Sequence, residues 1–439
     1  MHALNARTLL SAPALCGVLL FCQSTMAGAT LCVNPGGTSS CYSSIKAAVA
    51  AAASNDVINV AAGSYAEDVV IGKPLSLVGA GSDSTFIDAH GLANGVYVDG
   101  LDNSGLSNVL VTGFTIRNAN YEGILITNAS HVVISENHVT GNNQNLDITA
   151  PSCSGIPAFE TSEAEDCGEG IHLLGVNHSL VTNNESDLNS GGILLSDETG
   201  YTHDNIIAGN SVHDNPFDCG ITLASHPPAA QASSKLPYGV FNNTISANRS
   251  YSNGLATPGA GAGVGIFAPG PGNLDFGNKV IGNTLLNNGL PGVTIHNHAA
   301  PPGAPGVNLN DNVIARNYIS GNAADTEDAA TSGTAGINIY SVAPVAGLVI
   351  EGNTIENEAL DVVWNATGVL ELHMNNLLGG PTGAANTGQG TIDGTVNYWG
   401  CSAGPGTSGC TSASGGAAVN TTAYLGAPNP SAPDDRAGR

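Results

Sequence analysis

The sequence is poor in basic side chains. Ten Lys and Arg stand against 35 Asp and Glu, and the formal net charge is −25 at pH 7. A protein that reads nucleic acid needs a basic surface to neutralise phosphates, so this balance argues against nucleic acid as a partner. An anionic membrane surface is excluded as a partner for the same reason.

Apolar runs long enough to cross a membrane are also missing. Residues 1–29 hold one basic side chain, Arg7, followed by an apolar run from Leu9 to Cys22 and the small residues Ala27, Gly28 and Ala29. That run is shorter than the roughly 20 residues that span a bilayer, and the pattern is typical of a secretory signal. We therefore expect a mature chain that starts at Thr30, is secreted or periplasmic, and is a monomer.

Cysteines are few, and most of them come in local pairs. Removal of residues 1–29 would leave seven of the nine cysteines. In an oxidising compartment, cysteines close in sequence are expected to close loops as disulfides. The expected pairs are Cys32 with Cys41, Cys153 with Cys167, and Cys401 with Cys410. Cys219 is left over, and we interpret it as a packed free thiol.

A strand-like repeat fills the middle of the chain. Segments that read Gly, aliphatic, any residue, mostly aliphatic begin at Gly95, Gly123, Gly170, Gly192, Gly220, Gly265, Gly292 and Gly336. Four of the seven spacings between them are 22 to 28 residues, which is a solenoid period, and the longer ones would hold insertions. We call these segments the Gly-led strands.

A second motif alternates with the first and places one Asn five residues before another. The pairs are Asn137 and Asn142, Asn184 and Asn189, Asn210 and Asn215, Asn248 and Asn253, Asn283 and Asn288, and Asn317 and Asn322. Asn tolerates left-handed turns, and stacked amides of successive coils can form a hydrogen-bonded ladder. We interpret these residues as corners of the coil without a catalytic role.

Short alternating strands, Asn corners, 58 glycines and few aromatics predict an all-β parallel solenoid. One segment departs from this pattern: Ser-capped, Ala-rich residues 43–53 predict a helix. It precedes the first coil, where a solenoid must cover its open end, so it is expected to be an N-terminal cap.

Two segments carry a resemblance to a known group. Residues 41–88, "CYSSIKAAVAAAASNDVINVAAGSYAEDVVIGKPLSLVGAGSDSTFID", resemble the opening of secreted right-handed parallel β-helix proteins of the pectin-lyase-like superfold, and "VNYWGCSAGPG", residues 396–406, is similar to their closing segment. The resemblance implies a cap over 30–60, about ten coils over 61–395 and a closing segment over 396–426. Residues 427–439 are expected to be disordered. The superfold includes lyases, hydrolases, epimerases, adhesins and proteins of periplasmic copper-site assembly, so it assigns no chemistry.

One face of this solenoid carries chemically active side chains. In each Gly-led strand the first and third residues after Gly are aliphatic and face the core, so the second and fourth are expected to face solvent. The expected face holds Glu122, Glu169, His172, Ser196, Thr222, Phe267, Thr294, His296, Asn338 and Tyr340, with Asp197, Glu198, His226 and His298 just beyond the strands. Insertions over 143–167, 227–238, 254–263, 299–308 and 323–334 would wall this face, as binding faces of solenoids often are.

Coil spacing divides the face into two groups. Adjacent coils lie about 4.8 Å apart, so residues four coils apart are separated by roughly 19 Å. An upper group contains Glu169, His172, Asp197, Glu198, Asp218 and His226, and a lower group contains His296, His298, Asn338 and Tyr340. A groove along eight coils would run close to 40 Å, which suits a polysaccharide.

The upper group is the candidate for bond cleavage. Glycoside hydrolysis uses two carboxyl groups, about 5–5.5 Å apart for retention or roughly 6.5–9.5 Å for inversion. We expect Glu169 with Asp197, or Asp197 with Asp218, to be such a pair, with His172 and His226 assisting. A lyase would need a base and a cation that neutralises a uronate, yet the aligned face lacks Lys and Arg, so a Ca²⁺-dependent lyase is the weaker hypothesis.

Three interpretations of the lower group stay open. His296 and His298 can hydrogen-bond a sugar beside Tyr340 or Phe267, form half of a Zn or Cu site completed by Asp325, Glu327 or Asp328, or be plain surface. We assign substrate binding to Glu122, Ser196, Thr222, Phe267, Thr294, His296, His298, Asn338 and Tyr340. The favoured function is a polysaccharide hydrolase without a required cofactor, with Ca²⁺ as a candidate; a non-catalytic adhesion β-helix and a metal-handling β-helix are the alternatives.

Overall fold

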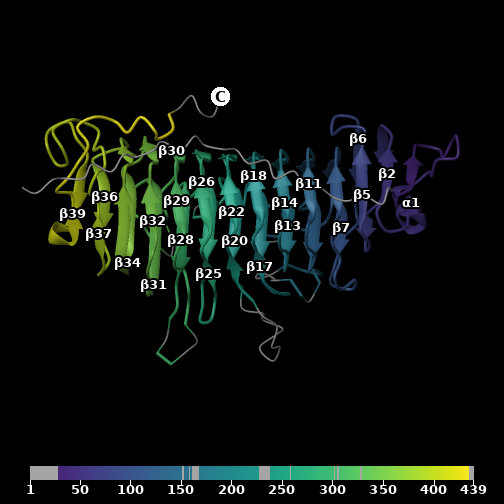
Figure 1. Cartoon of the computed structure of the whole chain (residues 1–439), viewed down its shortest axis with the longest axis horizontal. Coiled ribbons are helices and arrows are strands. Elements are labelled where there is room, and N and C mark those ends of the chain that lie inside the picture. The colour runs from purple at the N-terminus through teal and green to yellow at the C-terminus, as the bar shows by residue number, and fades with distance from the viewer. Residues whose placement is uncertain are drawn as a thin grey trace, which may run out of the picture.

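The structure is a computed structural model that describes residues 28–434 except 151–152, 158, 161–167, 227–237, 258, 301, 304–305 and 327–328. The expected signal segment up to residue 27, Cys167, Glu327 and Asp328 lie outside the described residues. Strands stack in parallel, coil on coil, along one long axis from α1 at one end to β39 at the other (Figure 1).

One face of the solenoid, the Gly-led face, contains the eight Gly-led strands together with one strand before them and three strands after them. They pair in parallel in the order β4 (Val69–Ile71), β7 (Val96–Asp99), β10 (Ile124–Thr127), β13 (Ile171–Leu174), β16 (Ile193–Ser196), β20 (Ile221–Ala224), β24 (Val264–Phe267), β28 (Val293–Asn297), β31 (Ala335–Val345), β34 (Leu360–His373), β36 (Thr382–Asn386) and β38 (Ser412–Ser414).

A second face follows each Gly-led strand along the chain. Its strands are β1 (Thr30–Val33), β2 (Asp56–Val60), β5 (Leu75–Gly79), β8 (Leu110–Thr112), β11 (Val133–Ser135), β14 (Leu180–Thr182), β18 (Ile206–Ala208), β22 (Thr244–Ser246), β26 (Lys279–Ile281), β29 (Val313–Ala315), β32 (Val349–Glu351), the end of β34, β37 (Thr391–Asp393) and β39 (Val419–Asn420). Since β34 takes part in both faces, the two count as one 25-stranded sheet.

The third face is an 11-stranded sheet. It contains β3 (Gly63–Tyr65), β6 (Thr85–Asp88), β9 (Thr115–Arg117), β12 (His138–Thr140), β15 (Glu185–Asp187), β19 (Ser211–His213), β23 (Arg249–Tyr251), β27 (Thr284–Leu286), β30 (Tyr318–Ser320), β33 (Thr354–Glu356) and β35 (Asn376–Leu377). A small sheet of β17 (Thr202–His203), β21 (Val240–Phe241) and β25 (Asp275–Phe276) lies between the Gly-led and second faces along the chain.

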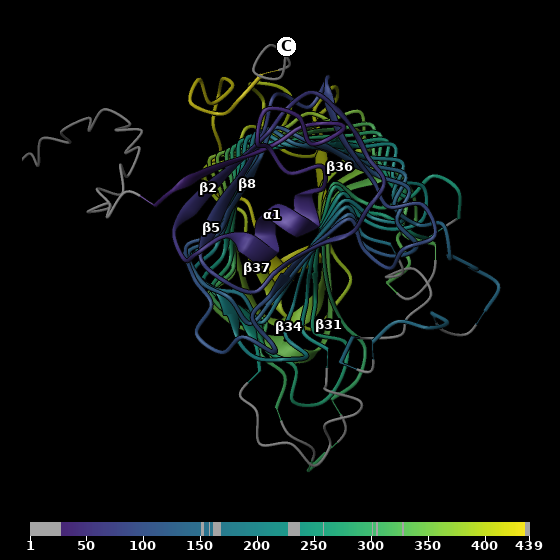
Figure 2. The ribbon, with the colours of Figure 1, turned by 90° about the vertical axis from the view of Figure 1, so that its right-hand side faces the viewer.

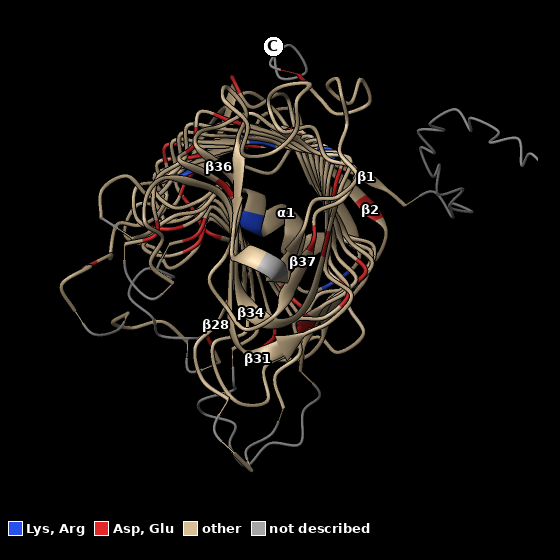
Figure 3. Ribbon diagram, turned by 90° about the vertical axis from the view of Figure 1, so that its left-hand side faces the viewer, with Lys and Arg blue, Asp and Glu red and all other residues tan. Residues whose placement is uncertain are grey.

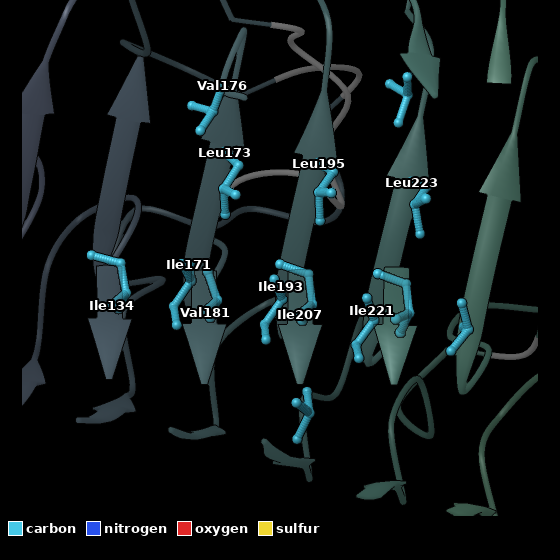
Figure 4. Close-up of a cluster of buried hydrophobic side chains, with 14 of the residues drawn as sticks. Ile134, Ile171, Leu173, Val176, Val181, Ile193, Leu195, Ile207, Ile221 and Leu223 are labelled. Carbon is cyan, nitrogen blue, oxygen red and sulfur yellow. The ribbon is translucent and has the colours of Figure 1, made fainter. Parts of the chain in front are cut away.

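The core is made of the aliphatic positions that the repeat marks. Ile171, Ile193 and Ile221 occupy one register position on successive coils and are fully buried. Leu173, Leu195 and Leu223 form the next row, and residues of the second face such as Val181 and Ile207 stand opposite (Figure 4). This stacking of identical aliphatic residues on successive coils confirms the prediction that the first and third residues after Gly face the core.

The Asn residues form the predicted ladders. Asn248 donates its backbone N–H and its side-chain amide to Oδ1 of Asn283, at 2.9 and 3.0 Å, and accepts the same two bonds from Asn210. The predicted left-handed conformation, however, is wrong for the Asn residues themselves. Positive φ angles fall one residue earlier, as at Ala247 (53°), because the Asn side chain must turn inward to reach the ladder.

The N-terminal helix α1 spans Ile45–Ala51, shorter than the predicted 43–53. Ser44 is its N-cap and accepts a hydrogen bond from the Ala47 N–H at 3.1 Å, while the Glu67 carboxylate accepts from the first two helical N–H groups. The helix lies across the end of the solenoid (Figure 2). Parallel pairing already begins with β1 on β2, so coil structure starts before the predicted boundary at residue 61.

The prediction of a disordered tail is wrong for residues 427–434. Asn429 is 6% exposed, and its backbone N–H donates to Asn376 at 2.7 Å. Its side-chain amide donates to the carbonyl of Met374 at 2.6 Å. The segment is therefore fastened to the last strand of the 11-stranded sheet, although its composition is rich in proline. Residues 435–439 lie outside the described residues.

Candidate functional site

The outward positions of the Gly-led strands are covered, which corrects the expectation of an open, solvent-facing groove. His172, Thr222, Thr294 and Asn338 are each 4% exposed or less. The covering segments are parts of the predicted insertions: the Asn338 amide, for example, donates to the carbonyl of Ala329 at 3.0 Å. The alternation of side chains along a strand correctly predicted that these residues point away from the core. Insertions that fold over the face nevertheless shield them from water.

Strand register separates the predicted carboxylate pairs. Ile171 aligns with Ile193, so Glu169 stands beside Gly191, and a Cβ on Gly191 would lie 2.5 Å from the Glu169 carboxylate. Asp197 instead follows the last residue of β16, about six residues farther along the strand direction, or roughly 20 Å. Glu169 and Asp197 therefore cannot flank one glycosidic bond.

Asp218 lies at the same end of the strands as Glu169. Its backbone N–H donates to the carbonyl of Ser190, and the Ser190 N–H donates to the carbonyl of Gly168, so the three residues stack on successive coils. Asp197 with Asp218 is thus also excluded as a pair. The Asp218 carboxylate accepts from Thr222 Oγ1 at 3.2 Å and lies against the buried Cys219 thiol, whose pKa is raised chiefly by burial and also by that carboxylate.

Asp197 organises the turn that follows β16. Its two carboxylate oxygens accept from Ser225 Oγ at 2.7 Å and from the His226 N–H at 2.9 Å. The residue is fully buried, and burial together with neighbouring Glu198 raises the pKa of Asp197 to about 7. Because both oxygens serve backbone and hydroxyl donors, Asp197 positions the next coil and is not aimed at a ligand.

Three residues from different segments meet over the face. One ligand atom of each of Glu122, Glu160 and His172 lies within 4.8 Å of the other two. Glu122 precedes β10, His172 is the second residue of β13, and Glu160 belongs to the insertion between β12 and β13. We call Glu122, Glu160, His172 and Glu198 the carboxylate cluster. Glu160 was not predicted from the sequence, since an insertion has no repeat position from which its direction could be predicted.

His172 and Glu198 extend the cluster toward the end of the strands. His172 Nε2 is 2.7 Å from Ser196 Oγ, and Nδ1 of His226 is 3.1 Å from Glu198 Oε1. Burial alone would raise the pKa of Glu198, but the hydrogen bond and charge of His226 outweigh it and lower the pKa to about 2. Glu198 is therefore ionised at neutral pH.

The other two carboxyl groups of the cluster are shifted in the opposite direction. Burial raises the pKa of Glu122 to about 7. Burial, reinforced by Glu122 and Glu198, raises the pKa of Glu160 well above its ordinary value. Burial also lowers the pKa of His172 to about 4, so that imidazole is neutral. Glu160, whose pKa is raised, thus interacts electrostatically with Glu198, whose pKa is lowered, and carboxyl groups with pKa values shifted apart are what acid and base catalysis uses.

The predicted lower group is assembled in the structure. The ring of His296 lies 5.6 Å from Phe267, 5.5 Å from His298 and 6.4 Å from Tyr340, all edge to face. His296 Nε2 is 3.3 Å from a carboxylate oxygen of buried Asp325, so the 323–334 insertion does fold back. Burial and the neighbouring His298 lower the pKa of His296 to about 3. Phe267, His298 and Tyr340 are half-buried and are the accessible part of this group.

Two predicted disulfides are present, Cys32–Cys41 and Cys401–Cys410. Cys153 is also disulfide-bonded, whereas Cys167 lies outside the described residues. Cys219 is a buried free cysteine, as predicted.

Acidic residues are distributed around the coil, and basic ones are sparse (Figure 3). In the part of the chain that the structure describes, no helix is long and apolar enough to cross a membrane.

Residues 82–252 match the family described as "Right handed beta helix region". The chain is a right-handed parallel β-helix. Solved structures with this β-helix architecture include the catalytic domain of a GH87 alpha-1,3-glucanase in complex with tetrasaccharides, at 12% identity and a TM-score of 0.52, covering 84% of this chain and 63% of that one. The DFA-IIIase from Arthrobacter chlorophenolicus A6 in complex with GF2 matches at 12% identity and a TM-score of 0.50, covering 84% and 88%.

A third similar structure is the catalytic unit of a GH87 alpha-1,3-glucanase from Streptomyces thermodiastaticus strain HF3-3, at 15% identity and a TM-score of 0.45. The match covers 86% of the chain described above. The β-helix spans 66% of that catalytic unit. No curated protein sequence matches the chain. At these identities the likeness establishes the fold alone.

Proposed function

We propose that this β-helix binds a carbohydrate over the Gly-led face and hydrolyses it at the carboxylate cluster. The observation that carries the proposal is the opposite shift of pKa in interacting carboxyl groups: His226 lowers the pKa of Glu198 to about 2, whereas burial raises the pKa of Glu122 and of Glu160. One protonated and one ionised carboxyl group are the two parts that glycoside hydrolysis needs. Binding of saccharides by the GH87 glucanase and DFA-IIIase structures supports the substrate class.

Each residue of the cluster has a distinct role in this proposal. Glu160 is the more accessible acid, because it is half-buried whereas Glu122 is 2% exposed, and it would protonate the leaving glycosidic oxygen. Glu198 would activate a water or attack the anomeric carbon. His226 keeps Glu198 ionised, and is therefore a positioning residue. Phe267, His298 and Tyr340 would bind a sugar ring farther along the face, by stacking and hydrogen bonds.

The test is to incubate the purified protein with a panel of neutral and acidic polysaccharides, with Ca²⁺ or with chelator. Reducing ends and the absorbance of unsaturated uronates are recorded together. We expect reducing ends without absorbance, and loss of about 10²- to 10⁴-fold in rate for Glu198→Gln. Glu358→Gln, a change at a buried glutamate far along the chain, is the matched control and should keep full activity.

Other outcomes select the alternative functions. Absorbance that vanishes with chelator would make the protein a Ca²⁺-dependent lyase and would remove the hydrolase proposal. Turnover that survives Glu198→Gln would place the chemistry elsewhere. Binding of a glycan without any turnover would favour a non-catalytic adhesion β-helix.

A further inference from the structure

The carboxylate cluster contains more unused ligand atoms than acid and base catalysis requires. Glu122 Oε2, Glu160 Oε1 and His172 Nδ1 are all buried, and none has a hydrogen-bond partner within the described part of the chain. Glu122 is 2% exposed and His172 is 4% exposed. A buried polar atom without a partner costs about 1–3 kcal/mol, so three in one place indicate that something else satisfies them.

Hydrogen bonds already occupy the other polar atoms of the His172 and Glu122 side chains. Ser196 Oγ holds Nε2 of His172 at 2.7 Å, which leaves Nδ1 as the free nitrogen. Gly168 donates its backbone N–H to the Glu122 carboxylate, which leaves Oε2 as its free oxygen. One ligand atom from each of Glu122, Glu160 and His172 then lies within 4.8 Å of the other two. Ligands at about 2.0–2.2 Å from a shared ion lie roughly 3.5 Å apart, so a small contraction would close the group.

We propose that Glu122, Glu160 and His172 bind one divalent transition-metal cation of the Zn²⁺ type. Two carboxylate oxygens and one imidazole nitrogen are a donor set that suits Zn²⁺ and its neighbours, whereas Ca²⁺ takes six to eight oxygens. The Ser196 hydroxyl on the far nitrogen of His172 orients the ring, as outer partners of metal-bound histidines do. A cation would also relieve the repulsion between Glu122 and Glu160.

Among the residues that the structure describes, three other groups of possible ligands lie on the surface and differ in kind. In His138 with Asp187, and in His373 with Glu371, the imidazole already bonds the carboxylate, at 2.9 and 2.8 Å. His203 is likewise bonded to Asp204, at 2.7 Å. Their ligand atoms are satisfied without an ion and are partly exposed. They are therefore comparison sites, and the buried group is the one that the geometry favours.

The metal has a consequence for catalysis that rests on the proposed function. A cation bound to Glu122 and Glu160 would occupy the carboxylate oxygens that the proposed function assigns to proton donation. The metal-bound protein would then lack its proton donor, so Zn²⁺ is expected to inhibit hydrolysis. Metal binding itself does not depend on any hydrolytic activity, and it is measured separately.

The experiment titrates chelator-treated full-length protein with Zn²⁺ by calorimetry and with Co²⁺ by absorption spectroscopy. We expect one tight site per chain, weakened at least about 100-fold in Kd by Glu122→Gln and by His172→Gln. The matched control is the double variant His178→Asn and His203→Asn, which disables a surface group and should keep the tight site. Retention of that site by both Glu122→Gln and His172→Gln, or its absence from the wild type, would overturn the proposal.

A second measurement guards against variants that fail to fold. Crystals of the wild-type protein grown with Zn²⁺ are examined at the zinc absorption edge for an anomalous peak. A peak between Glu122, Glu160 and His172 supports the site, and zinc found elsewhere overturns it. Because neither readout uses a carbohydrate, a failed metal site and a failed hydrolase proposal give different results.

Discussion

Glu358 takes the place of an asparagine at the end of the ladder that runs through Asn142, Asn189, Asn215, Asn253, Asn288 and Asn322. Asn322 donates its backbone N–H and its side-chain amide to Oε1 of Glu358, at 2.8 and 3.2 Å, as each earlier Asn does to the next. Glu358 is 2% exposed, and burial raises its pKa to about 7. The ladder therefore ends on a carboxyl group that prefers to be protonated.

Glu358→Gln is expected to stabilise the protein at pH 8. A raised pKa means that the folded state binds the proton more tightly, so this stability is present below about pH 4.5 and is lost as the pH rises through about 7. The difference amounts to about 3 kcal/mol, and Gln keeps the acceptor oxygen without the charge. Urea unfolding at pH 4.5 and pH 8 measures it. Glu351→Gln, at an exposed position on β32, is the control, and an unchanged stability at pH 8 for Glu358→Gln would contradict the argument.

Asn248→Ala is expected to lower the free energy of unfolding by at least about 3 kcal/mol. The substitution removes the acceptor of the Asn210 backbone N–H, one of the two acceptors of the Asn210 amide, and the amide donor to the carbonyl of Ile207, all in a buried place and each at about 1–3 kcal/mol. Urea unfolding followed by circular dichroism measures the loss. Ser246→Ala, half-buried two residues earlier, should cost far less; equal losses would show that the ladder adds no special stability.

The repeat predicts the fold because the same pattern of residues recurs in each coil. Aliphatic residues two apart, as in Ile171 and Leu173, leave one inward direction for the strand, and an Asn at each corner finds its partner on the next coil. Local pattern and global stacking agree at every turn, so few residues are needed to identify the architecture.

The site was harder to predict, because it depends on register and on insertions. The sequence placed Glu169 and Asp197 on one face and on neighbouring coils, and the pairing of Ile171 with Ile193 shows that one precedes its strand whereas the other follows its strand. Glu160 comes from an insertion, which has no repeat to fix its direction. The predicted approach of His296 to His298, which lie two residues apart along the chain, depended on neither register nor an insertion. It is confirmed, since the centres of the two rings lie 5.5 Å apart.

His296→Gln is expected to make the protein more resistant to acid. Burial lowers the pKa of His296 to about 3, so the unfolded state binds a proton more readily between about pH 6.5 and pH 3. Stability from this residue is therefore complete above about pH 6.5 and falls by about 1.4 kcal/mol per pH unit below it. Unfolding free energies at pH 7.5 and pH 4.5 should differ by roughly 2–3 kcal/mol less in the variant than in the wild type. Asp325 faces the same imidazole, so Asp325→Asn should be compared; an identical pH dependence in wild type and His296→Gln would refute the expectation.

The rate of hydrolysis is expected to fall as the pH rises, provided that the carboxylate cluster is the active site. The acid must hold its proton, and the pKa of Glu122, at about 7, marks where the cluster begins to lose protons. Glu198 keeps its charge down to about pH 2, so the acid limb should reflect unfolding and not loss of the base. Rates measured from pH 4 to pH 9 under substrate saturation should be level on the acid side and decline above neutrality. Glu122→Gln removes a carboxylate that interacts with Glu160, and since Glu122 helps to raise the pKa of Glu160, the decline should move to lower pH. A decline that moves upward, or a rate that rises with pH throughout, would indicate that a deprotonated group carries the rate-limiting step and that Glu160 is not the acid.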